Sequence, residues 1–153
     1  MNYRNAVVLL AFALAAPAAE LSVGSAALSA DKPAALHVTL ASGGAALTGI
    51  QFELEYDAKA VEVTVEAGQA ATDAGKTLQS SPIGAGKRRV IIVGFNQNGI
   101  ADGVVATIQV SLKDKATPGG DRAVRILAPV GTNRQGQSVP VTGRDGGVKV
   151  EAR

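Results

Sequence analysis

The chain has 153 residues with 18 glycines, 6 prolines and no cysteine, and only 3% of its residues are aromatic. The length suits one domain with a core of Val, Ala, Leu and Ile, and the lack of cysteine excludes a disulfide scaffold, a thiolate metal site and a lipid-anchored cysteine. The formal net charge is +2. Because the one basic run, Lys87–Arg89, has no aromatic residues nearby, nucleic acid is not expected as a partner.

The amino terminus has the pattern of a secretory signal peptide. Arg4 precedes an uninterrupted apolar run over residues 6–15, and Ala-Pro-Ala follows at 16–18 as a small-x-small cleavage site. A membrane span needs about 20 apolar residues, so this run is too short to be one. An uncleaved amino-terminal anchor is the alternative.

We therefore expect a signal peptide over residues 1–19, cleaved after Ala18 or Ala19. The domain would then occupy residues 20–153, where no second long apolar stretch follows. This organisation predicts a protein that is exported to the periplasm, the cell surface or the medium, with no membrane span in the mature chain.

Strands are predicted over most of the remaining chain, because apolar and polar residues alternate with a period of two. The alternating runs are 36–40, 50–56, 61–66 and 106–112, with shorter pieces between 124 and 150. Gly-rich turn signals separate them, which suggests eight or nine short strands in a two-sheet sandwich. Convincing helical periodicity is absent, and the small, polar segment Ala67–Lys76 is expected to be a loop.

One predicted strand breaks the alternation. Residues Val90, Ile91, Ile92 and Val93 are all apolar, and Phe95 follows shortly after. Two explanations are open. Long neighbours such as Glu53 and Arg89 could shield the outer side of a central strand, or the outer side could be an exposed apolar patch, which in a soluble domain marks an interaction site.

Five segments, taken in order, resemble the cohesin domain of bacterial cellulosome scaffolds. They are Gly49–Asp57, Val61–Val63, Lys87–Phe95, Asp102–Ile108 and Asp145–Val150. The first is similar to the family's strand ending in Tyr-Asp-Pro, with Ala58 in place of the proline. The fourth is similar to the family's Asp-Gly-x-x-Ala-x-Ile segment. The resemblance extends over residues 20–151.

The resemblance implies an all-β fold, a two-sheet antiparallel β-sandwich that forms a nine-stranded jelly-roll of the cohesin type. In the family, one sheet face binds dockerin, a small calcium-loaded helical module. By position, this face would consist of the polar Gln51 and Glu53, the apolar centre Ile91 and Val93, and the rim residues Asn96, Asn98 and Gly99. Asn98-Gly99 is equally well explained as a tight turn with positive φ. The family's face also carries an aromatic residue, and none is found near Ser80 or Pro82.

The chain lacks the usual residue sets for catalysis. His37 is the only histidine, so a histidine triad or a multi-histidine zinc site is excluded. Glu53, Glu55 and Asp57 alternate along one strand face, about 6.5–7 Å apart from one to the next. That spacing could suit an inverting glycosidase, but an acidic stripe on a strand is ordinarily a solvated face. We expect no catalytic residue, no metal, no cofactor and no enzyme activity.

Three functions remain open at this point. The first is an interaction module that binds a dockerin-type partner in polysaccharide-degrading or cell-surface assemblies. The second is a carbohydrate-binding module on the same sandwich. The aromatic strip on which such modules stack sugars is missing, because only Phe52, Tyr56 and Phe95 follow the predicted signal peptide. The third is a structural domain that associates with itself at a surface.

Overall fold

The computed structural model describes residues 19–113 and 119–151. The predicted signal peptide therefore lies outside the described residues except for Ala19, with which the first strand begins. No helix within these ranges is long and apolar enough to cross a membrane. The elements are β1 (Ala19–Val23), β2 (Ser25–Leu28), β3 (Ala34–Ala41), β4 (Leu47–Glu55), β5 (Val61–Ala67), α1 (Gln69–Asp73), β6 (Thr77–Gly84), β7 (Lys87–Val93), β8 (Gly103–Leu112), β9 (Asp121–Asn133), β10 (Ser138–Arg144) and β11 (Gly146–Val150).

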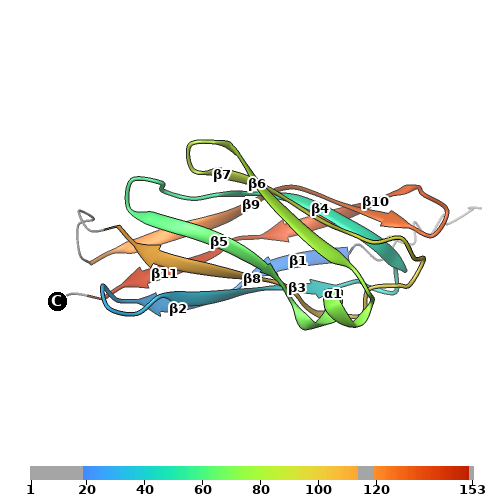
Figure 1. Cartoon of the computed structure of the whole chain (residues 1–153), viewed down its shortest axis with the longest axis horizontal. Helices are drawn as coiled ribbons and strands as arrows, with labels where there is room; N and C mark the ends of the chain where they lie inside the picture. The colour runs from blue at the N-terminus through green and yellow to red at the C-terminus, as the bar shows by residue number, and fades with distance from the viewer. Residues whose placement is uncertain (1–18, 114–118, 152–153) are drawn as a thin grey trace, which may run out of the picture.

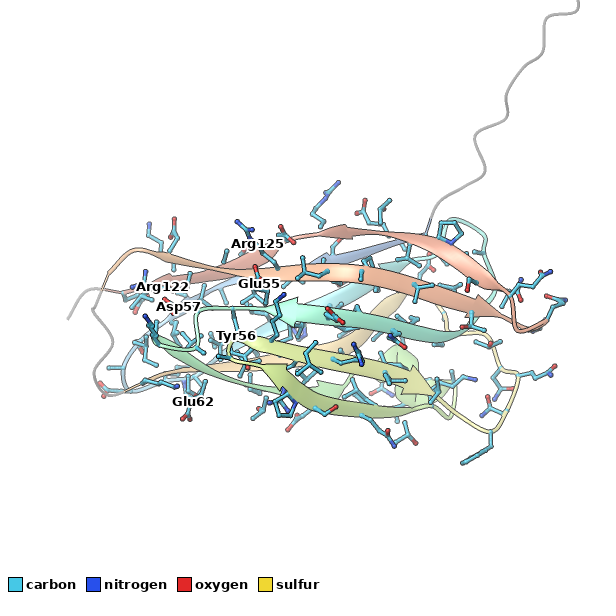
Figure 2. All side chains as sticks on the ribbon, turned by 90° about the horizontal axis from the view of Figure 1, so that it is seen from above. Glu55, Tyr56, Asp57, Glu62, Arg122 and Arg125 are labelled. Atoms are coloured by element: carbon cyan, nitrogen blue, oxygen red, sulfur yellow. The ribbon has the colours of Figure 1, made fainter. Side chains whose placement is uncertain are left out.

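The strands form two layers that pack face to face (Figure 1). One layer has the order β5-β8-β3-β1, and the other has the order β10-β9-β4-β7-β6. The two layers are joined by hydrogen bonds between β1 and β10, and β11 pairs with β9 and β2 outside this order. Figure 2 looks down on the second layer, with β9, β4 and β7 running side by side. The all-β sandwich predicted from the alternation is confirmed.

The strand count and one detail of the pairing differ from the prediction. The described chain has eleven strands where nine were expected. Only Gly24 separates β1 from β2, and only Asp145 separates β10 from β11. Both breaks lie where the first and last segments of the domain meet: β1 pairs with β10, and β2 pairs with β11. These two ladders are parallel, whereas the other ladders are antiparallel as predicted.

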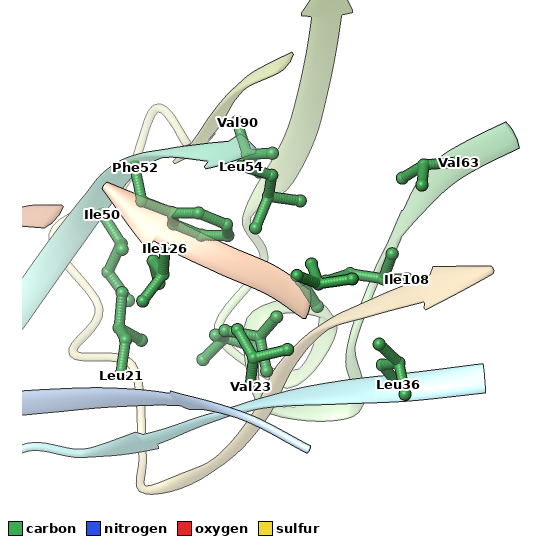
Figure 3. Close-up of a cluster of buried hydrophobic side chains, with 14 of the residues drawn as sticks. Leu21, Val23, Leu36, Ile50, Phe52, Leu54, Val63, Val90, Ile108 and Ile126 are labelled. Carbon is green, nitrogen blue, oxygen red and sulfur yellow. The ribbon is translucent and has the colours of Figure 1, made fainter. Parts of the chain in front are cut away.

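The core lies between the two layers and contains the apolar half of each alternating run. In β3, Leu36, Val38 and Leu40 are buried, while the residues between them face solvent. Phe52 of β4 is the largest fully buried side chain and lies among aliphatic side chains from both layers (Figure 3). Burial of a side chain of this kind is worth about 1.5–3 kcal/mol, so the stability of the fold rests on this cluster.

Two local predictions are wrong. The segment expected to be a loop contains the short helix α1, whose residue Ala71 is completely buried. Gly68 precedes α1, and a side chain there would collide with the backbone of Val104, so α1 packs tightly on β8. The tight turn with positive φ that was one interpretation of Asn98-Gly99 is not formed, because neither residue has a positive φ. Here a short helix and an extended loop are held by tertiary contacts, which local sequence pattern does not encode.

A candidate partner-binding face

The candidate site is the solvent-facing side of the layer that contains β9, β4, β7 and β6, here called the outer face. Its strand register is a series of rows across the four strands. One row runs through Gln79, Ile91, Gln51 and Val130, because each is the Cα partner of the next. The sequence-predicted residues Gln51 and Ile91 are therefore direct neighbours in the sheet.

The second row runs through Ser81, Arg89, Glu53 and Leu127. Val130 and Leu127 are three residues apart, and in a regular strand they would point to opposite faces. A bulge in β9 changes this, because two residues, Ala128 and Pro129, lie opposite the single residue Phe52, and Ala128 adopts a φ of +47°. The bulge places both apolar side chains of β9 on the outer face.

The burial of the β7 residues distinguishes between the two explanations of their apolar sequence, a shielded strand and an exposed apolar patch. Val90 and Ile92 are completely buried, while Val93 is 47% exposed and Ile91 is half-buried. Glu53 and Arg89 do not cover Val93, because they lie in another row and bind each other. The outer face thus carries four apolar side chains that are at least partly exposed, here called the apolar strip: Ile91 and Val93 on β7, and Leu127 and Val130 on β9. The exposed Gln51 of β4 lies between Ile91 and Val130.

Gly49 of β4 lies beside Val93 on the outer face. A Cβ atom on Gly49 would be 3.4 Å from Cγ1 of Val93 and 3.7 Å from Cβ of Thr132. An outward side chain here would therefore cover part of Val93. Gly49 itself is buried, so the side chains of Val93 and Thr132 on either side of it form the surface here.

The other end of the outer face is charged. Arg89 Nη2 lies 3.0 Å from Glu53 Oε1, and Lys87 Nζ lies 3.6 Å from Glu55 Oε2. Arg125 is the Cα partner of Glu55 on the neighbouring strand, and both are labelled in Figure 2. Exposed pairs of this kind contribute little to stability, but they give the face a polar half next to its apolar half.

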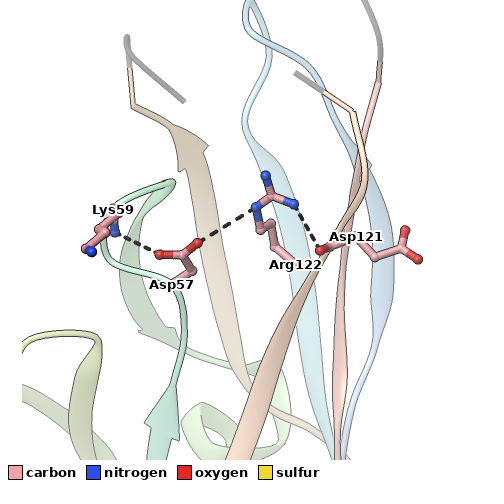
Figure 4. Close-up of polar contacts among 4 residues, drawn as sticks. All are labelled: Asp57, Lys59, Asp121 and Arg122. Carbon is pink, nitrogen blue, oxygen red and sulfur yellow. Dashed lines mark hydrogen bonds and ion pairs between the residues drawn. The ribbon is translucent and has the colours of Figure 1, made fainter. Parts of the chain in front are cut away.

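The acidic stripe considered for glycosidase chemistry is used in ion pairs. Each carboxylate faces a cation: Glu53 faces Arg89, Glu55 faces Lys87, and Asp57 Oδ2 lies 3.9 Å from Arg122 Nε. Asp57 also accepts a hydrogen bond of 3.0 Å from the backbone N–H of Lys59, which fixes the turn after β4 (Figure 4). Among the described residues no group of three or more His, Cys, Asp or Glu side chains could hold a metal ion.

The predicted rim residues belong to a braced loop between β7 and β8. Asn96 Oδ1 accepts a hydrogen bond of 2.7 Å from Lys76 Nζ, and Asn96 Nδ2 donates one of 3.2 Å to the Ala74 carbonyl. Asn98 Nδ2 donates to the same carbonyl at 3.2 Å. Lys76 is nearly fully buried, and this burial lowers the pKa of its ammonium group. The amide of Asn96 is thus engaged within the chain, and Asn98 and Gly99 are exposed beside it.

Sequence reasoning did not assign three residues that the structure places on or next to the outer face. Leu127 and Val130 were missed because the bulge in β9 gives no simple sequence signal. Phe95 is completely exposed, at 113% of the reference value for the residue. A signal for Phe95 was present, because Ile91, Val93 and Phe95 follow the same period of two.

The solvent-facing side of the other layer differs in chemistry. Its rows contain Glu66, Thr107 and His37 in one place and Thr64, Gln109 and Ala35 in another. His37 is exposed, as predicted, and its Nδ1 lies 3.4 Å from Thr107 Oγ1. Because large apolar side chains are absent from these rows, the outer face is the better interaction surface of the two.

The fold is thus a two-layer β-sandwich, and one of its two solvent-facing sides carries exposed apolar side chains. The family model described as the cohesin domain matches residues 19–150. The chain therefore belongs to the cohesin domain family, whose members are non-catalytic protein-binding modules.

Solved structures agree with this assignment at the level of the fold. The sixth cohesin of scaffoldin B from Acetivibrio cellulolyticus, solved in complex with a mutant Cel5 dockerin, has a TM-score of 0.75 and 22% identity over 88% of this chain and 99% of that chain. A non-cellulosomal cohesin from the archaeon Archaeoglobus fulgidus has a TM-score of 0.71 and 18% identity over 88% and 92%. The OlpC cohesin from Clostridium thermocellum, also solved with a dockerin, has a TM-score of 0.71 and 17% identity over 88% and 94%. No curated protein matches the chain in sequence.

Proposed function

We propose that the chain binds a dockerin-type module through its outer face. The observation that carries this proposal is the apolar strip on β7 and β9, of which the half-exposed Val93 is the most exposed member. The chain belongs to the cohesin domain family, and solved members of that family are in complex with dockerins. Desolvated apolar residues at the centre of an interface supply most of its binding energy, and the surrounding polar residues exclude water.

The proposed contacts follow from the pairing of residues across the strands of the outer face. Ile91 and Val93 would form the apolar centre, and Gln51 would offer an exposed amide next to Ile91. Glu53 would act through its pair with Arg89 at the polar border. At the rim, Asn98 and Gly99 would touch the partner, whereas Asn96 would hold the loop in place through its bonds to Lys76 and Ala74.

Isothermal titration of the purified chain with calcium-loaded dockerin modules tests the proposal. Val93→Asp should abolish binding, because it places a charge at the centre of a surface that must lose water. Thr64→Asp is the matched control, since Thr64 is exposed on β5 in the other layer. Equal binding by the wild-type chain and Val93→Asp would refute the assignment of the outer face.

We further propose that the protein acts outside the cytoplasm, as part of a polysaccharide-degrading or cell-surface assembly. The support is the signal-peptide pattern before Ala19 and the family's typical use as a scaffold module outside the cell. Cell fractionation with an antibody against the domain tests this proposal. Recovery of all the protein in the cytoplasm, with residues 1–18 still attached, would contradict it.

A further inference from the structure

Phe95 has an exposure that folding does not explain. Among the described residues the exposed large apolar side chains are Ile83, Val93 and Phe95, and Phe95 is the most exposed of them at 113%. Its ring therefore contributes nothing to the core. A fully exposed aromatic side chain keeps its whole apolar surface in water, and such residues mark places where another surface can bury them.

The loop that carries Phe95 is braced by two neighbouring segments. On one side, the turn between α1 and β6 accepts hydrogen bonds from Asn96 and Asn98 at the Ala74 carbonyl. From the same turn, Lys76 Nζ donates to the backbone carbonyl of Asn96 at 3.0 Å. On the other side, Arg134 Nε donates to the Gln97 carbonyl at 3.2 Å.

The residue before Phe95 is also fixed. A Cβ atom on Gly94 would lie 2.9 Å from the carbonyl oxygen of Gly75, so the chain passes close to the turn between α1 and β6 at this point. Because its backbone is held on both sides, Phe95 cannot easily fold back onto the domain. A side chain presented on a rigid loop loses less conformational entropy when it is bound.

Phe95 lies close in the chain to the apolar residues of β7. It follows Ile91 and Val93 at the same period of two, just past the end of β7. Two residues beyond the half-exposed Val93, the chain thus presents one fully exposed aromatic ring.

We propose that Phe95 is an anchor that inserts into an apolar pocket on the helical partner bound to the outer face. This inference rests on the proposed function. The inference adds a requirement on the partner: its surface must contain an apolar pocket, large enough for an aromatic ring, beyond the end of β7. Buried aromatic anchors of this kind are common hot spots of protein interfaces.

Titration calorimetry of four chains with one panel of calcium-loaded dockerin modules tests the inference. The panel contains the Cel5 dockerin of Acetivibrio cellulolyticus and the dockerins of the chain's own organism. The chains are the wild type, Phe95→Ala, Ile83→Ala and Val93→Asp. Ile83 is the matched control, because it is an exposed apolar residue on β6 that does not belong to the strip.

Phe95→Ala should weaken binding by about thirtyfold, the size of a hot-spot truncation. Its thermal unfolding should not change, because the ring touches no core residue. Ile83→Ala should bind within about twofold of the wild type, as most peripheral residues do, and Val93→Asp should not bind.

Two outcomes separate the possible failures. If Phe95→Ala binds as tightly as the wild type while Val93→Asp does not bind, the anchor is wrong and the proposed function stands. If the wild-type chain binds no dockerin of the panel, the proposed function and the anchor both fail. If Phe95→Ala bound more weakly and also melted several degrees below the wild type, the anchor would be overturned too, because Phe95 would then be a structural residue.

Discussion

Neighbouring valines of β7 should respond to the same substitution in different ways, because one faces the core and the other faces solvent. Val90 is completely buried, and Val93 is 47% exposed. Val90→Ala removes two buried methyl groups, so the free energy of unfolding should fall by about 2 kcal/mol from lost transfer energy and the cavity left behind. Val93→Ala removes the same atoms from a half-exposed position, which should cost less than about 1 kcal/mol.

Urea denaturation and thermal scans of the two variants measure this difference. At about 4 °C per kcal/mol for a domain of this size, Val90→Ala should melt about 8 °C below the wild type and Val93→Ala less than about 4 °C below it. Binding of dockerin should show the opposite order, with the larger loss for Val93→Ala. If Val93→Ala were the more destabilising variant, the face assigned to β7 would be wrong, and so would the apolar strip on the outer face.

Three further predictions concern other parts of the fold. Gly146→Ala should prevent stable folding, because its Cβ would collide with the carbonyl oxygens of Val23 and Gly24, whereas Gly84→Ala should be tolerated since no atom lies within 4 Å; circular dichroism of both variants checks this. Hydrogen bonds from Ser42, first from its side chain and then from its backbone N–H, lower the pKa of Asp102. A lowered folded-state pKa adds stability above the unfolded value of about 4 and loses it in acid, so the stability gap between wild type and Asp102→Asn should be present at neutral pH and close below that value. Finally, if the chain is exported as proposed, its first residue should be Ala19 or Glu20; intact mass measurement of the mature protein would contradict this by showing Met1 as the first residue.

The sequence predicted the sandwich well, because burial in most strands depends only on the alternation of side chains. Leu36, Val38 and Leu40 show this in β3, and Phe52 and Leu54 show it in β4. The same alternation applied to β7 predicted that Ile91 and Val93 face outward, and both lie on that side.

The features that were missed depend on contacts between distant segments. The bulge at Ala128, which places Leu127 on the outer face, is defined only by pairing with β4. The bracing of Asn96 depends on Lys76, twenty residues earlier in the chain. Local patterns cannot reveal such contacts, because they arise when the strands pair and the loop packs.

The split of the first and last strands was missed for the same reason. Gly146 looks like part of a Gly-rich turn in the sequence, yet its position is fixed by the close approach of the backbone at Gly24. Parallel pairing of the two ends of the chain requires this contact, and the alternation of residues in either segment does not contain it.

The central claim, that the outer face binds a dockerin-type partner, is tested most directly by an NMR titration. Amide and methyl signals of the isotope-labelled chain would be followed as an unlabelled, calcium-loaded dockerin is added. We predict that Gln51, Ile91, Val93 and the loop around Phe95 shift, while Thr64 and Thr107 in the other layer do not. Shifts confined to Thr64, Thr107 and their neighbours would contradict the account.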